Sequence, residues 1–231
     1  MTAAWLAFWD SPHLIYVNAR HRDVHYRLIA EQIATFVPSR EARVLDYGCG
    51  DALHAGEVAA AAGMLYLCDG APGLRAELAK RFAGNAKIRV VAPEDVERLP
   101  DGTLDLAVLH SVAQYLTHDE LTALLTLFRR LLKADGLLLI SDIVPPDVSA
   151  AADAMALLRF GRANGFCCAA AIGLARTVVS PYWRLRSRYG LTRYSQAAIT
   201  DKLAAAGFTA QRTAQNVGHN WRRMAFTARP R

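Results

Sequence analysis

The segment from Val44 to Ala52 constrains the fold of this chain more than any other. It reads Val-Leu-Asp-Tyr-Gly-Cys-Gly-Asp-Ala, an apolar run that ends in an acid and is followed by two glycines one residue apart. An alanine-rich segment of helical composition, residues 53–62, comes next, and we expect the helix to run from residue 51 to residue 62. Glycine permits positive φ and lets a ligand approach the backbone without an intervening Cβ. The segment therefore predicts a buried strand that turns sharply into a helix and holds a ligand at the turn.

Strand and helix patterns alternate from residue 42 onward. This alternation is typical of a doubly wound parallel sheet with helices on both faces. Thr117-His-Asp-Glu120 has the pattern of a capping box that begins a helix, and Ser195 is expected to cap another. We expect an α/β, Rossmann-like doubly wound sheet of seven strands, mostly parallel with a C-terminal antiparallel strand. The expected strands are 43–47, 64–68, 88–91, 104–109, 137–140, 208–215 and 224–228.

Two segments fall outside this alternation. Residues 1–40 have apolar positions at helical spacing and are interpreted as an N-terminal helical cap. Residues 147–194 are interpreted as a helical insert between strands five and six, and residues 1–231 as a single domain. In the cap, Tyr16 and Arg20 belong either to a solvated helix face or to a lid over the turn, where they would reach a carboxylate.

Composition narrows the class of protein. The chain has 231 residues and 53% hydrophobic content, which suits one globular core. Its start lacks the pattern of a signal peptide, and its longest apolar run, residues 166–175, is about half the roughly 20 residues that span a bilayer. The four cysteines, Cys49, Cys68, Cys167 and Cys168, form no CxxC pair. We therefore expect a cytoplasmic protein with free thiols and no metal site.

The positive charge is concentrated in two segments. The net charge of the chain is +6, but residues 151–194 carry seven arginines and one acid, and residues 209–231 carry five arginines and no acid. Such segments serve solubility, or they attract an anionic substrate, a membrane surface or a nucleic acid. The sequence leaves these alternatives open.

Polar residues follow several of the expected strands. In an open parallel sheet, ligands bind beyond the carboxyl ends of the strands. Asp69 ends the second strand about 20 residues after the glycine turn, where an acid binds ribose hydroxyls. This arrangement suits NAD as well as other nucleosides, so it does not identify the ligand. The other residues at strand ends are Asp46, Gly48, Gly50, Asp95, His110, Ser111 and Asp142.

Five segments occur in the order of one enzyme family. Residues 44–52 resemble its first motif, and Asp95-Val-Glu-Arg-Leu-Pro100 resembles its acidic stretch before strand four. Residues 104–110 and 132–140 resemble its fourth and fifth strands, and residues 195–208 resemble the helix before its sixth. Together these segments resemble the class I S-adenosylmethionine-dependent methyltransferases. Ala52 replaces the last glycine of the first motif, and Ala134-Asp135 replaces Pro-Gly before strand five.

The resemblance implies a role for each matching residue. Asp46, Gly48 and Gly50 would shape the pocket for the methionine part and the ribose. Asp69 would accept both ribose hydroxyls, and Asp95 with the Val96 amide would bind the adenine edge. His110 and Ser111 would lie beneath the sulfonium. The full set of candidate S-adenosylmethionine-binding residues is Tyr16, Arg20, Asp46, Gly48, Cys49, Gly50, Asp69, Gly70, Asp95, Val96, His110 and Ser111.

The resemblance also implies methyl transfer, for which positioning supplies most of the catalysis. A general base is needed only where the acceptor loses a proton, and His110 and Tyr115 are the leading candidates, ahead of His118 and His219. The sequence after strand four lacks the Asn-Pro-Pro-Tyr pattern of amino methyltransferases that act on DNA or protein. We expect a small-molecule acceptor with an apolar part and an anionic group, with contact to a membrane or a lipid-linked substrate left open and no nucleic acid. The alternatives are an RNA methyltransferase and a non-catalytic cofactor-binding domain.

Overall fold

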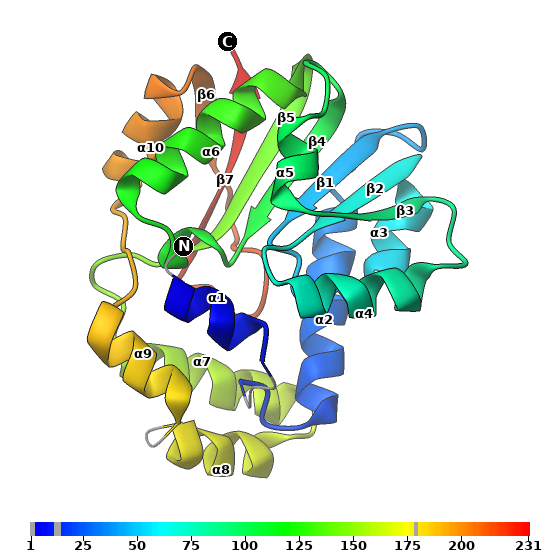
Figure 1. Cartoon of the computed structure of the whole chain (residues 1–231). Helices are drawn as coiled ribbons and strands as arrows, with labels where there is room; N and C mark the ends of the chain where they lie inside the picture. Colours follow the sequence, from blue (N-terminus) through cyan, green and yellow to red (C-terminus); the bar gives the residue numbers. More distant parts are fainter. Residues whose placement is uncertain (1–2, 12–14, 178–179) are drawn as a thin grey trace.

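The central element is a mixed sheet of seven strands. The computed structural model describes residues 3–11, 15–177 and 180–231, so residues 1–2 and 12–14 of the expected cap and 178–179 of the expected insert lie outside the described residues. The spatial order of the strands confirms the expected fold class (Figure 1). The strands, in that order, are β3 (Ile88–Val91), β2 (Met64–Cys68), β1 (Arg43–Tyr47), β4 (Leu104–His110), β5 (Leu132–Ile143), β7 (Met224–Pro230) and β6 (Phe208–Arg212).

Five strands run parallel, and β7 is antiparallel to both β5 and β6. The strand order along the sheet reverses between β1 and β4, so these two strands flank the switch point of the sheet. In open α/β sheets the ligand binds at this point, beyond the carboxyl ends of the strands.

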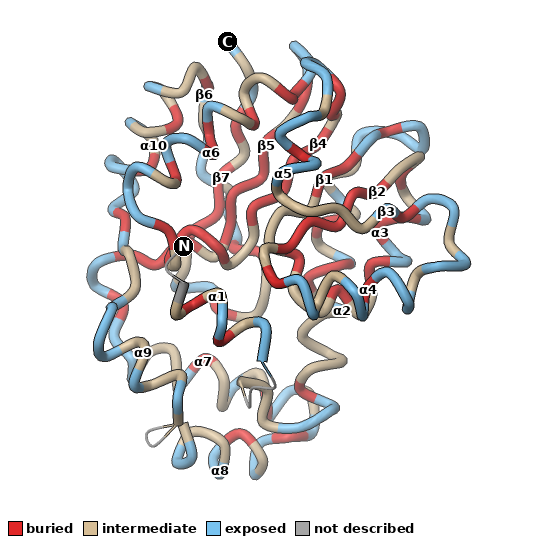
Figure 2. The backbone as a smooth tube through the Cα atoms, viewed as in Figure 1, coloured by how far each residue is buried: buried red, intermediate tan, exposed pale blue. Residues whose placement is uncertain are grey.

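Helices cover both faces of the sheet because side chains of a strand alternate between its faces. On one face, Leu45 packs with α6 (His118–Leu131) and α10 (Gln196–Ala205). On the other face, its neighbour Val44 packs with α2 (Ala19–Ala34), α3 (Ala55–Ala61) and α4 (Pro72–Phe82). Figure 2 shows the buried backbone running through the sheet between these layers.

The remaining helices gather beyond the carboxyl end of β5 (Figure 1). They are α1 (Ala3–Trp9) from the cap, and α7 (Ala150–Ala163), α8 (Cys167–Thr177) and α9 (Pro181–Tyr189) from the insert. Cap and insert contact each other, since the Tyr182 ring lies 5.9 Å from the rings of both Trp5 and Phe8. Within the described ranges, no helix is long and apolar enough to cross a membrane.

Several elements differ from the expectations, and among them β6 ends at Arg212 rather than at residue 215. The helix after the glycine turn begins at Ala55 rather than at residue 51, because Gly50 and Ala52 have φ of 57° and 42°, which no right-handed helix allows. Residues 93–97 form a short helix, α5 (Pro93–Glu97), and residues 113–115 a 3-10 turn. The fifth strand begins five residues early, at Leu132, which pairs with Leu104 across an irregularity in register. Both expected caps are confirmed: Thr117 and Glu120 bond reciprocally, and the Ser195 hydroxyl accepts from the Ala198 amide at 3.1 Å.

Candidate functional site

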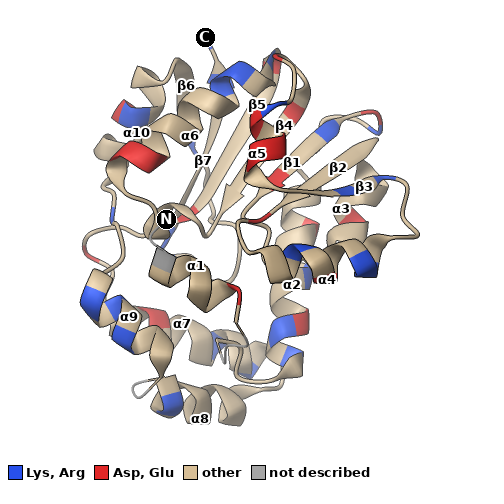
Figure 3. Cartoon of the chain, in the orientation of Figure 1, with Lys and Arg blue, Asp and Glu red and all other residues tan. Residues whose placement is uncertain are grey.

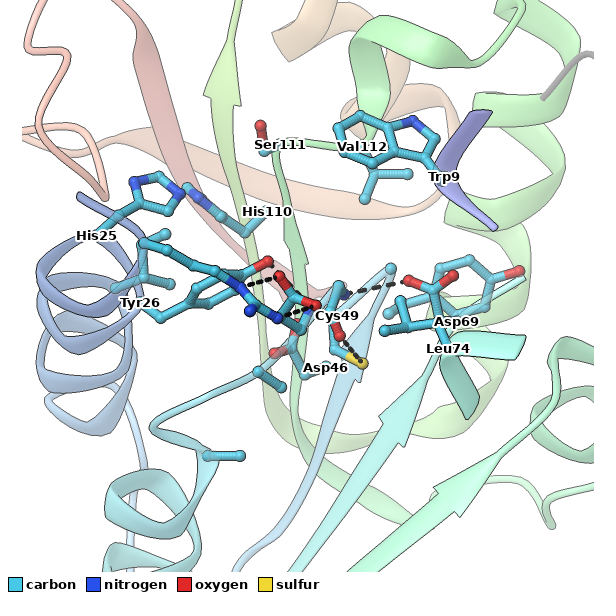
Figure 4. A pocket seen from close by; sticks show the side chains of 18 of the residues that line it. Trp9, His25, Tyr26, Asp46, Cys49, Asp69, Leu74, His110, Ser111 and Val112 are labelled. Atoms are coloured by element: carbon cyan, nitrogen blue, oxygen red, sulfur yellow. Dashed lines mark hydrogen bonds and ion pairs between the residues drawn. The ribbon is translucent and has the colours of Figure 1, made fainter. Parts of the chain in front are cut away.

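A cavity of about 1060 Å³ lies at the switch point of the sheet. Its floor is the turn after β1 and the end of β2, one wall is α2, and another is the end of β4 (Figure 4). The helix α1 supplies Leu6 and Trp9 to the lining. Of the sequence-derived candidates, the cavity brings together Tyr16, Asp46, Gly48, Cys49, Gly50, Asp69, Gly70, His110, Ser111 and Tyr115.

The glycine turn is held against the end of β2. The amides of Gly48 and Cys49 both donate to the Cys68 carbonyl, at 2.7 and 3.1 Å, and the Gly50 amide donates to Asp69 Oδ2 at 3.1 Å. Gly48 has a φ of 76°, and a Cβ there would lie 2.3 Å from Val112 Cγ2. Because its amides are already bonded, this turn does not present a row of free N–H groups to a phosphate.

Two acids, the half-buried Asp46 and the buried Asp69, form the floor of the cavity. Asp69 is 8% exposed, and its second oxygen accepts from the Ala71 amide at 2.9 Å. Burial raises the pKa of Asp69, and the bonds from Ala71 and Gly50 oppose the rise. Burial, with a smaller contribution from Asp69, raises the pKa of Asp46 to about 7. These two carboxyls create a floor that favours positive charge.

The rest of the lining strengthens this negative character. Three more carboxylates, Asp10, Asp51 and Glu77, lie along the cavity. Of the described residues that line it, Arg22 is the single lysine or arginine, and it forms a bidentate pair with Asp51 at 2.7 Å for both contacts. The cavity therefore suits a ligand with a net positive charge and offers no unpaired cation to an anion.

The α2 wall includes residues that the sequence analysis did not single out. The Tyr26 hydroxyl accepts from the Asp51 amide and from the Tyr16 hydroxyl, at 2.9 Å in each case, and so connects α2 to the glycine turn. Arg22 and Tyr26 are four residues apart, which places both on one face of a helix. Polar residues four positions apart within an expected helix were the sequence pattern that could have identified Arg22 and Tyr26.

The end of β4 carries His110 and Ser111. His110 Nδ1 lies 2.9 Å from Ser141 Oγ, and burial lowers the pKa of His110, with Arg223 adding to this effect and Asp142 opposing it. Ser111 has a φ of 59° and donates to Asp142 Oδ2 at 2.7 Å. Asp142 has a φ of 63° and also binds Arg223 at 2.8 Å. Strained non-glycine residues of this kind cluster at functional sites.

Two further side chains lie near His110. His25 lines the cavity, and Figure 4 shows its imidazole next to that of His110. Burial, then the neighbouring histidines, lowers the pKa of His25 well below 6.5, so its ring is neutral at pH 7. Burial raises the pKa of Tyr115 well above 10, so this phenol stays protonated at pH 7 and cannot act as a general base. His118 and His219 lie outside the lining of this cavity.

Three candidate residues are not part of the cavity. Arg20 is exposed, and its Nε donates to the Asn164 carbonyl in the insert. Asp95 caps α5, accepting from the Ala92 amide at 3.0 Å and pairing with Arg98 at 3.1 Å. The Val96 amide donates to the Ala92 carbonyl within the same helix. The structure therefore places these three residues outside the lining of the cavity, and their polar groups bond to other parts of the chain.

Comparison with known proteins agrees with this geometry. Residues 45–140 match the family model described as a methyltransferase domain. No curated protein matches the chain. Solved structures with the same fold include a DhpI–SAH complex, for which no source organism is named, with 14% identity, 98% of this chain and 95% of that chain covered, and a TM-score of 0.61.

Two other similar structures are of named methyltransferases. Magnesium protoporphyrin IX methyltransferase from Synechocystis PCC 6803, with bound SAH, has 16% identity, coverage of 99% and 93%, and a TM-score of 0.59. The 1,6-didemethyltoxoflavin-N1-methyltransferase of Burkholderia thailandensis has 20% identity, coverage of 90% and 81%, and a TM-score of 0.56. Identities this low establish the fold, and the family match establishes the domain type. The chain has the fold of the class I, S-adenosylmethionine-dependent methyltransferases, and its residues 45–140 match a methyltransferase domain.

Proposed function

We propose that the cavity binds S-adenosylmethionine and that the chain transfers its methyl group to a small-molecule acceptor. The observation that carries this proposal is the acidic lining of the cavity: Asp46 and Asp69 lie on its floor, and the turn amides bond to Cys68 and Asp69 instead of facing an anion. S-adenosylmethionine has a net charge of +1 at neutral pH, whereas NAD brings a pyrophosphate that this turn would not neutralise.

The floor of the cavity holds the cofactor in this proposal. Asp69 accepts one hydrogen bond at each oxygen, which leaves a lone pair on each oxygen for a ribose hydroxyl. Leu74, Pro93 and Val112 supply apolar lining beside it. Asp95 and Val96 are left out of the cofactor site because they do not line the cavity. When bound, the cofactor supplies a methyl group on a sulfonium, which a nucleophile displaces in line.

The acceptor belongs at the end of β4 in this proposal. His110 and His25 line the cavity there and are neutral at pH 7, so either ring nitrogen that is free of a proton can accept one from the acceptor. Trp9, Leu6 and Leu116 supply apolar and aromatic surface. Since the described lining offers no unpaired lysine or arginine, the proposal keeps the expected apolar part of the acceptor and omits its anionic group.

Matched substitutions of two acids, Asp69 and Asp95, test the cofactor assignment. The variant Asp69→Asn should weaken the binding of S-adenosylhomocysteine about 100-fold, because two hydrogen bonds to a charged acceptor are worth about 3 kcal/mol together. Asp95→Asn removes the other motif acid and should leave the affinity within about twofold. Isothermal titration calorimetry measures both, and a thermal melt shows whether each variant is folded. Equal losses for the two variants would contradict the assignment.

The acceptor class is tested by incorporation of label. The protein is incubated with methyl-labelled S-adenosylmethionine and a bacterial extract, which is then separated into RNA, lipid and small-metabolite fractions. Label in the metabolite or lipid fraction supports a small-molecule acceptor. Label confined to RNA would favour the alternative RNA methyltransferase. Normal cofactor binding without label in any fraction would favour a non-catalytic binding domain.

A further inference from the structure

The helix α8 presents an apolar face to solvent. Its inner side is fully packed: Ala170 is 0% exposed, and Gly173 faces Val17 so closely that a Cβ there would lie 2.2 Å from Val17 Cγ1. Its outer side carries Cys167, Cys168, Ala171, Ile172 and Ala175, all exposed, and we name these five residues the α8 outer face. Ile172 is 54% exposed. A surface helix normally carries charged and polar residues on this side.

Arginines without a carboxylate partner lie on α8 and on the helices before and after it, α7 and α9. From residue 154 to residue 200 the chain has seven arginines and no acid. Two of the seven are engaged, since Arg186 pairs with Asp153 and Arg193 donates to the Pro146 carbonyl. A third, Arg159, lies over the Trp221 ring. The other four, Arg162, Arg176, Arg184 and Arg188, are exposed and have no carboxylate partner in the part of the chain that the structure describes. Of these, Arg188 lies over the exposed ring of its neighbour Tyr189, at 5.4 Å.

These arginines belong to the same end of the molecule as α8. Arg162 lies near the end of α7, Arg176 in the last turn of α8, and Arg184 and Arg188 on α9. Figure 3 shows basic residues on α8 and α9, at the end of the molecule opposite the chain's C-terminus. An apolar centre flanked by cations matches the interface of a bilayer, where apolar side chains enter the headgroup boundary and arginines contact anionic headgroups.

We propose that the α8 outer face and its four flanking arginines form a docking surface for a bilayer that contains anionic lipids. The charge decides against a second copy of this chain, because two such faces would bring arginines together with no acid to neutralise them. The apolar composition of the face decides against a nucleic acid, because its centre has neither strong hydrogen-bond donors for phosphates nor aromatic rings on which bases could stack. The helix is 11 residues long, so it docks as part of the folded domain and does not anchor by itself.

Vesicle flotation of the purified protein tests this inference without cofactor or acceptor. Vesicles of phosphatidylcholine with 30% phosphatidylglycerol, the chosen composition, should float the protein, and vesicles of phosphatidylcholine alone should not. The double variant Arg176→Gln, Arg184→Gln should bind these vesicles about 25-fold more weakly. Each arginine near an anionic surface contributes about fivefold to the affinity. Ile172→Glu, which places a carboxylate in the apolar centre, should weaken binding at least as much.

Controls separate a specific surface from general basicity. Arg98 is also exposed, at 75% of its side chain, but lies beside α5, so Arg98→Gln should bind vesicles like the parent protein. Calorimetry with S-adenosylhomocysteine shows that each variant keeps its fold, and it reports on the proposed cofactor site independently. Equal flotation of the parent and the Ile172→Glu variant would overturn the proposal, as would failure to bind anionic vesicles. Tighter binding to a single-stranded RNA of 20 nucleotides than to these vesicles would overturn it in favour of a nucleic acid.

Discussion

In the glycine turn after β1, Gly48 tolerates little change. Its φ of 76° disfavours any L side chain, and a Cβ there would lie 2.3 Å from Val112 Cγ2, a branched side chain with little freedom to move. We expect Gly48→Ala to lower the free energy of unfolding by at least about 2 kcal/mol, because strain in the left-handed region adds to overpacking. Urea unfolding followed by circular dichroism measures the change.

A second glycine provides the control. Gly56 lies in α3, and a Cβ there would meet no heavy atom within 4 Å. Gly56→Ala should therefore raise the free energy of unfolding by up to about 1 kcal/mol, since alanine favours a helix over glycine. Adding Val112→Ala to the Gly48→Ala variant should recover the part that comes from the clash and leave the part that comes from φ. If Gly48→Ala and Gly56→Ala change stability alike, the turn does not require glycine at Gly48.

The two motif acids, Asp69 and Asp95, show what a sequence pattern can and cannot predict about single residues. Strand-end position predicted Asp69 in the cavity, where parallel strands end at one edge of the sheet. The same reasoning placed Asp95 there, but Pro93 begins a short helix and the Asp95 carboxylate caps it. Likewise, Arg20 and Arg22 are two residues apart on a helix and point about 200° apart around its axis, so Arg22 lies in the cavity and Arg20 outside it. Which side of α2 faces the turn depends on tertiary packing.

At the scale of elements, the strands were predictable and the covering helices were less so. Buried aliphatic runs fixed the bounds of β1, β2 and β3 without error, since few other structures accommodate them. The sequence predicted helical character in residues 147–194, but their placement against α1 depends on aromatic contacts between distant segments. One such contact, between Trp5 and Tyr182, joins residues 177 positions apart. No local pattern specifies a contact of that kind.

Asp10 connects α1 to α4. Asp10 Oδ1, just after α1, accepts from the Gly73 amide at 2.7 Å and from the Leu74 amide at 3.4 Å, at the N-terminus of α4. A carboxylate at this position is favoured by the helix dipole. Because α1 supplies Leu6 and Trp9 to the cavity, Asp10 holds part of the cavity wall closed.

We therefore expect Asp10→Ala to speed the release of bound S-adenosylhomocysteine. Loss of a helix cap costs about 1 kcal/mol, which corresponds to a release rate about fivefold higher if the bonds are present in the bound state and lost on opening. Stopped-flow tryptophan fluorescence measures release, with Trp9 in the cavity wall as a reporter. Asp101→Asn, at a carboxylate 77% exposed and paired with Arg130, serves as the control and should release at the parent rate. A release rate for Asp10→Ala equal to that of the parent would show that Asp10 does not hold the wall.

At the scale of the whole molecule, buried histidines set the response to acid. Burial lowers the pKa of His21, to about 4, and likewise lowers the pKa values of His25, His110 and His219. The unfolded chain then binds more protons than the folded one between the lowered values and about pH 6.5, so stability falls as pH falls through that window. Asp46 acts in the opposite direction: its folded pKa of about 7 means that the folded state binds more protons between about pH 4 and 7, and stability rises as pH falls.

Four histidines outweigh the two carboxyls with raised pKa values, Asp46 and Asp69, so we expect the free energy of unfolding to fall between pH 6.5 and pH 4. His21 connects the titration to structure, because its Nδ1 accepts from the Val17 amide at 3.3 Å and its ring stacks on Phe166 of the insert at 4.9 Å. The variant His21→Gln keeps an acceptor for Val17 and removes the titrating group. Its loss of stability between pH 7 and pH 4 should be smaller than that of the parent by about 3 kcal/mol, the value of a pKa lowered from 6.5 to about 4. Urea unfolding at pH 7, 6, 5 and 4 measures this difference, and parallel curves for the two proteins would show that His21 does not drive the acid response.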